Sequence, residues 1–156
     1  MANVRMPPRC AFVVSGHRSG VGKTTVALGL IRALSDRGAR VAALKIGPDF
    51  LDPGHYAGAG AAFVRNLDPI LQTVRGMKEI FAQAKPFDAI VVEGAMGLFD
   101  GPFPGKTTAG TADVARIFKL PVVLVCDARS SAQSVAAEIV GARALLCGTP
   151  IVGVIL

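Results

Sequence analysis

The stretch SGHRSGVGKTT, residues 15–25, decides the fold, because it is a glycine-rich turn between an apolar run and a helix-like run. A strict phosphate-binding loop reads G-x-x-x-x-G-K-[ST]. Counting back from Gly22, the first glycine of that pattern would fall at position 17, where this chain has His17. Gly16 comes one residue earlier, so the strict pattern fails while its physical parts remain.

Those parts form a cradle for an anion. Glycines at positions 16, 20 and 22 let the backbone turn its amide groups inward. Lys23 can reach the outer phosphates of a nucleotide, and Thr24 opens a helix whose N-terminus favours negative charge. The flanking strand and helix favour this interpretation over an ordinary strand-to-helix turn. We therefore predict that a nucleotide binds to Gly20, Val21, Gly22, Lys23, Thr24 and Thr25, with the Thr24 hydroxyl as a magnesium ligand.

Outside this loop, strand-like and helix-like runs alternate along the chain. Short apolar runs rich in β-branched residues predict strands at 10–16, 40–47, 88–94, 120–127 and 150–156. Apolar residues at helical spacing predict helices at 23–38, 69–85, 112–118 and 131–146, with loops at 47–60 and 94–110. Strands that are apolar on both faces indicate an α/β fold, a parallel sheet with helices on both faces. The carboxyl ends of its strands share one edge, where ligands bind in such folds.

Two carboxylates follow the second predicted strand at that edge. Asp49 and Asp52 lie three residues apart in KIGPDFLDP, residues 45–53. Asx turns beside the prolines are one explanation, but next to a phosphate loop we favour a magnesium ligand and a partner for the reacting group. For Lys45 we favour a phosphate or substrate contact over a plain strand-end lysine.

A third carboxylate, Glu93, ends the buried strand in VVEGAMGLFDG, residues 91–101. Burying a carboxylate is costly unless it binds something charged, so we predict that Glu93 is a metal ligand. Gly94 and Gly97 would let a ligand approach the backbone closely. Asp100 is a further possible contact, for which the role of a turn residue is a serious rival.

The composition fits one domain with a substantial core. Of the 156 residues, 51% are hydrophobic and 18% are charged, which argues against disorder. No apolar run is long enough for a membrane span or a signal peptide, so we expect a cytoplasmic protein with no membrane partner. Cys10, Cys126 and Cys147 lack metal-ligand or disulfide spacing and fit small buried thiols.

The net charge of +6 would attract an anionic ligand through its field. The basic residues are scattered, and the chain has a single tyrosine. A surface that binds nucleic acid through stacking aromatic residues is therefore not indicated.

Taken together, the motifs SGVGKTT, KIGPDFLDP, RNLDP, VVEGAMGLFDG and PVVLVCDARSSAQSVAA resemble cobyrinate (or hydrogenobyrinate) a,c-diamide synthases. They occur in the order and spacing of that family, over nearly all of residues 10–156. The resemblance implies a P-loop NTPase-like fold, shared with dethiobiotin synthetase, and the cofactors ATP and Mg²⁺. It also implies a ligase of corrinoid (vitamin B12) biosynthesis, which activates the a- and c-carboxylates of an anionic tetrapyrrole as acyl phosphates.

Carried over to this chain, the resemblance assigns the site residues. Magnesium would be held by Thr24 and Glu93 with Asp49 or Asp52. The catalytic residues would be Lys23, Asp49, Asp52 and Asp100.

The resemblance also sets expectations beyond the site. Residues 1–156 would form a single ATP-binding synthetase domain of a longer protein. Ammonia would come from a separate C-terminal glutaminase domain, whose catalytic pair of a nucleophilic cysteine and a histidine does not occur in this sequence. A homodimer is a further possibility. One departure concerns His55 and Tyr56, because the family has a Tyr/Trp-His order after the DPG motif.

Alternatives remain at this point. A partitioning or septum-site ATPase would carry a second lysine at position 18, where this chain has Arg18, which we interpret as a surface residue. Dethiobiotin synthetase and Ni-sirohydrochlorin diamide synthase are related ligases. Structural roles are favoured for His17 as a solvated loop residue, for Asp68 and Asp127 as helix caps, and for Ser130 or Ser131 as a cap.

Overall fold

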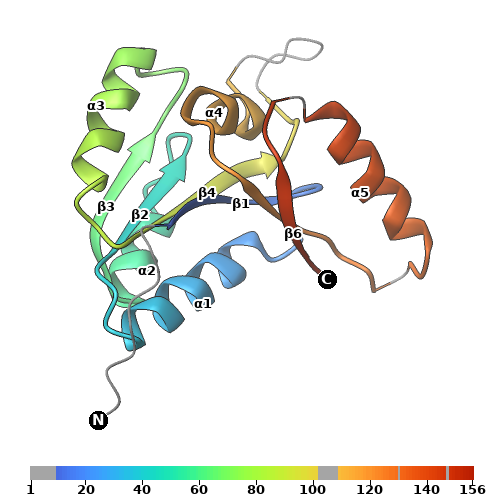
Figure 1. Ribbon diagram of the computed structural model, residues 1–156, viewed down its shortest axis with the longest axis horizontal. Helices are drawn as coiled ribbons and strands as arrows, with labels where there is room; N and C mark the ends of the chain where they lie inside the picture. The colour runs from blue at the N-terminus through green and yellow to red at the C-terminus, as the bar shows by residue number, and fades with distance from the viewer. Residues whose placement is uncertain (1–9, 102–108, 130, 147) are drawn as a thin grey trace.

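The sheet consists of parallel strands only. The computed structural model describes residues 10–101, 109–129, 131–146 and 148–156. Within them, a six-stranded sheet has the order β3-β2-β4-β1-β5-β6 (Figure 1). The strands are β1 (Cys10–Gly16), β2 (Val41–Ile46), β3 (Ala61–Leu67), β4 (Ala89–Gly97), β5 (Val122–Val125) and β6 (Ile151–Ile155). Ser130, Cys147 and the middle of the predicted loop 94–110 lie outside the described residues.

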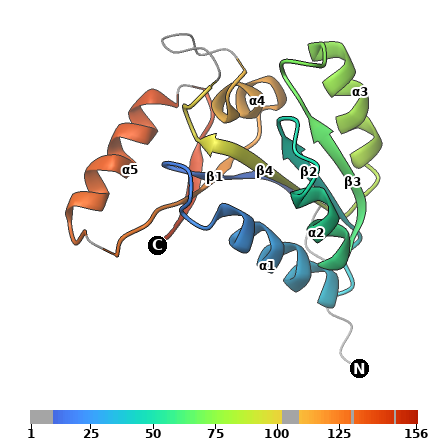
Figure 2. The ribbon, with the colours of Figure 1, turned by 180° about the vertical axis from the view of Figure 1, so that it is seen from behind.

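Helices cover both faces of this sheet, as predicted. Those described are α1 (Lys23–Asp36), α2 (Asp52–Gly58), α3 (Val74–Ala84), α4 (Thr111–Phe118) and α5 (Ser134–Leu145). The first two lie on one face, and α3, α4 and α5 lie on the other, as two opposite views show (Figures 1 and 2). Among the described residues, no helix is both long enough and apolar enough to cross a membrane.

Each face of the sheet has its own hydrophobic cluster, because successive side chains of a strand point to opposite faces. On the α1 and α2 face, Ala27 and Ile31 of α1 pack with Ala43 of β2 and Val91 of β4. Ala27 and Ile31 lie one helical turn apart, which puts both on the side of α1 that faces the sheet. Tyr56 of α2 belongs to the same cluster.

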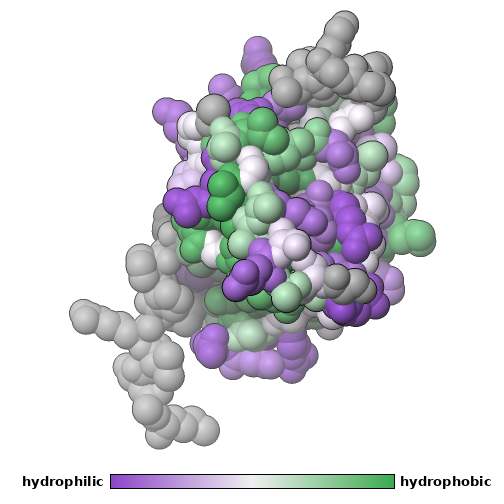
Figure 3. All heavy atoms as spheres, turned by 90° about the vertical axis from the view of Figure 1, so that its right-hand side faces the viewer, coloured by the Kyte–Doolittle hydropathy of each residue, from purple (hydrophilic) through white to green (hydrophobic). Residues whose placement is uncertain are grey.

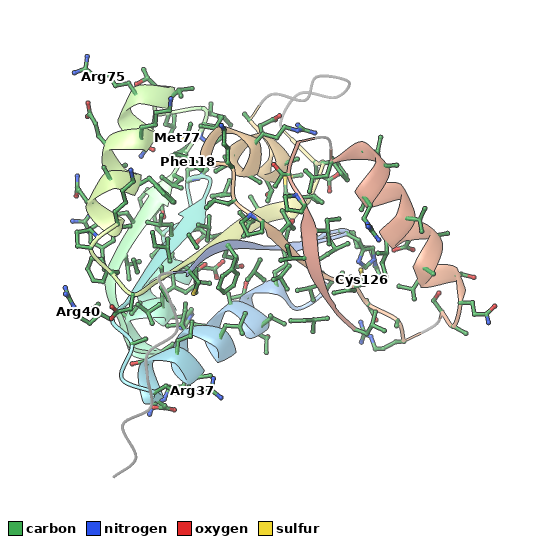
Figure 4. All side chains as sticks on the ribbon, in the orientation of Figure 1. Arg37, Arg40, Arg75, Met77, Phe118 and Cys126 are labelled. Atoms are coloured by element: carbon green, nitrogen blue, oxygen red, sulfur yellow. The ribbon has the colours of Figure 1, made fainter. Side chains whose placement is uncertain are left out.

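The opposite cluster is larger. Phe81 of α3 and Phe118 of α4 stack with their ring centroids 4.6 Å apart, and Met77 and Phe118 appear between these helices in Figure 4. The side chains of Arg37, Arg40 and Arg75 point outward at the periphery, which fits the scattered basic residues noted in the sequence (Figure 4).

The side that carries α5 and β6 is mixed in character. Val140 and Leu145 of α5 and Val152 of β6 are exposed. In the space-filling view of this side, hydrophobic and hydrophilic residues are interleaved over the coloured surface (Figure 3).

Three elements differ from the sequence prediction. The region 47–60, predicted as a loop, contains α2, and residues 61–67, for which no strand was predicted, form the edge strand β3. The helix predicted from residue 69 begins only at Val74, with Thr73 as its cap. Asp68 therefore does not cap this helix. It accepts hydrogen bonds from the backbone N–H groups of Ile70 and Leu71 and closes a turn before it.

Candidate nucleotide and catalytic site

The loop between β1 and α1 has the backbone shape that the sequence predicts. Gly20 and Gly22 adopt φ angles of 76° and 93°, in the left-handed region that glycine tolerates best. Gly22 is the N-cap of α1, so the helix N-terminus opens directly onto the loop. Lys23 is buried, and this burial, together with the charge of Lys45, lowers its pKa.

Glu93 is the acceptor at the centre of the site. Its side chain is 1% exposed, and three side chains donate to it. Thr24 Oγ1 lies 2.6 Å from Oε1, Lys45 Nζ lies 2.9 Å from the same oxygen, and the Tyr56 hydroxyl donates to Oε2. The predicted meeting of the phosphate loop with Glu93 is therefore present.

The arrangement follows from strand register. Lys45 of β2 and Glu93 of β4 are directly paired on adjacent parallel strands, so their side chains point to the same face. That face is the one covered by α1 and α2. Thr24 reaches Glu93 because α1 starts at the end of β1, which pairs with β4.

Lys45 connects Glu93 to the acids after β2. Its Nζ lies 2.7 Å from Asp52 Oδ2 and 3.8 Å from Asp49 Oδ2. Burial would lower the pKa of Lys45, but the hydrogen bonds and charges of Asp52 and Glu93 outweigh it and raise the pKa. The four side chains form one charged cluster at the carboxyl edge of the sheet.

Asp49 and Asp100 both make the turns that the sequence left as alternatives. Asp49 Oδ1 accepts from the backbone N–H groups of Leu51 and Asp52. Burial would raise the pKa of Asp49, and these hydrogen bonds with the charge of Lys45 lower it instead. Asp100 Oδ2 accepts from the N–H of Gly97 at 3.0 Å.

The glycines in the last part of β4 serve the protein's own packing. A Cβ atom at Gly97 would lie 2.5 Å from Asp100 Oδ2, and one at Gly94 would lie 2.7 Å from Thr111 Cγ2. The close approach predicted at these glycines is therefore made by neighbouring protein groups.

A cavity of about 270 Å³ gathers most of the predicted site residues. Asp49, Val21, Thr25 and Asp100 are absent from its lining, and Thr25 is exposed. The lining residues are Ser19, Gly20, Gly22, Lys23, Thr24, Lys45, Asp52, Glu93, Gly94 and Met96.

A second cavity, of about 540 Å³, adjoins the same phosphate loop. The loop residues Gly20 and Gly22 line both cavities, and Val21 lines the second. Its other lining residues are Cys126, Asp127, Ala128, Arg129 and Leu156.

A third cavity, of about 560 Å³, is lined by residues to which we assigned no functional role, among them His17, Arg18 and Asp127. His17 is mostly buried, with Nε2 3.2 Å from Glu138 Oε2, so the prediction of a solvated residue is wrong. Asp127 does not cap α5, which starts at Ser134; it pairs with Arg129 at 2.8 Å and Arg18 at 3.2 Å. Arg18 is at the surface, as predicted, with its side chain 62% exposed.

The residues around the 270 Å³ cavity fit Mg²⁺ bound together with a nucleotide. The described residues contain no group of three or more His, Cys, Asp or Glu side chains placed to hold a metal unaided. Mg²⁺ does not require such a cage, because it is usually bound through one or two carboxylates with phosphate oxygens and waters. Thr24, Asp52 and Glu93 offer a hydroxyl and two carboxylates beside the phosphate loop.

Sequence reasoning missed Tyr56 and Met96. Tyr56 reaches the site only because α2 packs over β2 and β3, and α2 was not predicted. Its signal was the departure at His55 and Tyr56 from the family order. Met96 has a positive φ of 51° at the cavity wall, which the sequence does not signal.

Comparison with known proteins agrees with the geometry. Residues 12–156 match the family model described as the CobQ/CobB/MinD/ParA nucleotide binding domain. Hydrogenobyrinate a,c-diamide synthase of Mycobacterium tuberculosis is 46% identical over 151 residues, which cover 94% of this chain and 33% of that protein. Cobyrinate a,c-diamide synthase of a Synechococcus species is 47% identical over 129 residues, covering 81% of this chain and 28% of that protein. The chain thus spans about a third of the length of these relatives.

Solved structures of lower identity show the same fold. A nucleotide-binding protein from Archaeoglobus fulgidus in complex with ADP has a TM-score of 0.60 at 19% identity, covering 94% of this chain and 65% of that one. FlhF complexed with GMPPNP and Mg²⁺ has a TM-score of 0.59 at 16% identity, covering 93% and 54%. The predicted P-loop NTPase-like fold and the resemblance to a,c-diamide synthases are confirmed, and the chain belongs to the CobQ/CobB/MinD/ParA nucleotide binding domain family.

Proposed function

We propose that this chain is the ATP-dependent synthetase domain of a glutamine-hydrolysing cobyrinate or hydrogenobyrinate a,c-diamide synthase. The observation that supports it is one cavity at which the phosphate loop, Lys45, Asp52 and Glu93 converge. A cationic cradle beside clustered carboxylates is what a triphosphate with a divalent metal requires.

In this proposal, the nucleotide lies across the phosphate loop. Its phosphates occupy the 270 Å³ cavity, where Lys23 and the loop amides bind them. Thr24 and Glu93, with Asp52 or Asp49, hold magnesium, which neutralises charge on the phosphoryl oxygens when bound. The 540 Å³ cavity receives the nucleoside, because it adjoins the same loop and has apolar walls at Val21, Cys126 and Ala128.

The chemistry joins two steps. An oxygen of the substrate carboxylate attacks the γ-phosphorus of ATP, and the bond to ADP breaks to leave an acyl phosphate. Ammonia then attacks the acyl carbon, phosphate leaves, and the nitrogen loses a proton to give the amide. Lys23, Lys45 and the acids supply position and charge compensation rather than covalent chemistry.

Exposed apolar residues beside the cavity fit a large substrate with apolar faces. Phe50 and Leu51, after β2, are 87% and 80% exposed, and Met96, near the end of β4, lines the cavity itself. The net charge of +6 favours an anionic ligand. A tetrapyrrole with carboxylate side chains has both properties. A glutaminase domain elsewhere in the full-length protein would supply ammonia.

The test supplies ATP, Mg²⁺ and an ammonium salt to the chain with each macrocycle, and detects amides by mass spectrometry. We expect diamide formation, and a loss of at least about 100-fold in Lys23→Ala with the fold retained, the scale for removing one preorganised charge contact. The exposed Lys78 on α3 provides the matched control, so Lys78→Ala should behave as wild type. Unchanged turnover in Lys23→Ala would refute the assignment.

The same assay separates the alternatives. Amidation of Ni-sirohydrochlorin, or carboxylation of a diamine as by dethiobiotin synthetase, with neither corrinoid accepted, would identify a related ligase. ATP-driven dimerisation in gel filtration, coupled to binding of DNA or lipid and without amide formation, would identify a partitioning-type switch.

A further inference from the structure

One side chain that contacts Glu93 has no role in the proposed chemistry. Tyr56 is 1% exposed and donates its hydroxyl to Glu93 Oε2. The other two donors, Thr24 and Lys45, both use Oε1. The two carboxylate oxygens of Glu93 therefore have different neighbours.

The fold fixes Tyr56 in this place. Its ring packs in the cluster of α1, α2 and the sheet, and its hydroxyl meets Glu93 where that apolar face ends. Asp52 and Tyr56 lie four residues apart on α2, so one helix face presents both toward Lys45 and Glu93. A buried tyrosine hydroxyl normally has such a polar partner.

The two carboxylate oxygens of Glu93 therefore face different surroundings. The phenol occupies Oε2, while Oε1 lies with Thr24 and Lys45, both of which line the 270 Å³ cavity.

We propose that Tyr56 is a positioning residue, which binds Oε2 of Glu93 and holds Oε1 toward the metal beside the phosphate loop. The inference rests on the proposed function, because it assumes that Glu93 serves a nucleotide-bound Mg²⁺. Residues that orient a metal ligand typically change metal affinity or activity by about 10- to 100-fold when removed.

The test measures the Mg²⁺ concentration at half-maximal binding of a fluorescent ATP analogue, which needs no turnover. Tyr56→Phe keeps the ring and removes only the hydroxyl. We expect this midpoint to rise by about tenfold or more, excess Mg²⁺ to restore binding, and metal-free binding of the analogue to stay as in wild type.

Two controls separate positioning from general stability. Thr73→Ala removes the side-chain cap of α3, far from the site, and should lower the unfolding temperature without moving the Mg²⁺ midpoint. In a Glu93→Gln background, Tyr56→Phe should add no further shift, because the hydroxyl acts through the carboxylate. A full additional shift in that background would contradict the proposal.

The outcomes distinguish this inference from the function on which it rests. If wild-type binding of the analogue does not respond to Mg²⁺, the proposed function fails and the inference with it. If wild type responds and the Tyr56→Phe midpoint stays within about twofold of it, only the role of Tyr56 is overturned. Should Tyr56→Phe not fold, Tyr56→Met keeps an apolar side chain without the hydroxyl: a rise of about tenfold in its midpoint supports the inference, and a midpoint within about twofold of wild type contradicts it.

Discussion

Lys45 is the residue on which the charge balance of the site depends. Its side chain is only 7% exposed, and it lies within 3 Å of carboxylate oxygens of both Asp52 and Glu93. Two carboxylates this close would repel one another in a poorly hydrated place. The ammonium group of Lys45 therefore balances the negative charge of the two carboxylates.

Replacing Lys45 with methionine should show how much this charge balance contributes to stability. The side chain keeps similar bulk but leaves buried Glu93 without its cation, so we expect a loss of about 3 kcal/mol in the free energy of unfolding. Urea denaturation measures it, and Lys78→Met is the matched surface control. Mg²⁺ should stabilise Lys45→Met more than wild type, since it supplies the missing positive charge. A loss below about 1 kcal/mol would mean that Lys45 contributes no more than a surface ion pair.

The lowered pKa of Lys23 predicts how nucleotide affinity changes with pH. Burial and Lys45 lower its pKa, whereas a bound triphosphate would raise it again. Nucleotide binding should therefore take up protons at alkaline pH, in the range below the ordinary lysine value of about 10.5, and affinity should fall as pH rises there. In the free protein the same shift makes stability increase with pH over this range, because the unfolded chain binds the proton more tightly.

Calorimetry of nucleotide binding in two buffers of different ionisation enthalpy measures the proton uptake. Lys23→Arg is the control, because its guanidinium does not titrate in this range and should take up no proton. Equal proton uptake by the two proteins would contradict the assignment to Lys23.

At the scale of elements, the strands buried in the middle of the sheet were predictable and the edge was not. β1 and β4 are apolar on both faces, which is the pattern that identifies a central parallel strand. β3 lies at the edge, and all its residues except Leu67 are at least partly exposed, with Arg65 and Asn66 within it. A search for doubly apolar runs passes over such a strand.

The helix α2 was not predicted, because its segment is rich in residues typical of turns. Gly47, Pro48 and Asp49 do form a loop, but Pro53 falls in the first turn of α2, where its missing N–H costs nothing. The chain therefore turns and starts a helix within one proline-rich segment. Periodicity alone cannot detect a helix of seven residues.

The same distinction explains what could be predicted of the site. Lys23, Thr24 and Glu93 meet because of strand order and loop position, which the sequence pattern specifies. The position of Tyr56 depends on how α2 packs over β2 and β3, and the sequence contains no periodic signal for that contact. The sequence could not decide whether Asp49 and Asp100 form turns or bind a ligand, since a carboxylate beside glycine or proline suits both roles.

For the whole molecule, the sheet order places the site at a change of direction in the topology. The helix α1 connects β1 to β2, which lies on the far side of β4. The helix α4 connects β4 to β5, which lies on the far side of β1. The chain thus leaves β1 and β4, which are neighbours in the sheet, in opposite directions, and α1 and α4 lie on opposite faces (Figure 2). Open α/β sheets bind ligands at such a point.

Because elements from both faces and several strands meet there, a ligand at this point should stabilise the domain as a whole. Mg²⁺ and ATP at about 100 times the dissociation constant would add roughly 2.7 kcal/mol to the free energy of unfolding. For a domain of this size, that corresponds to a rise of roughly 5–10 °C in the unfolding temperature. Scanning fluorimetry with ATP, Mg²⁺ and both together measures it, and we expect the full rise only with both. Lys23→Ala should lose the rise, and a rise that grows with protein concentration would instead indicate dimerisation on ATP.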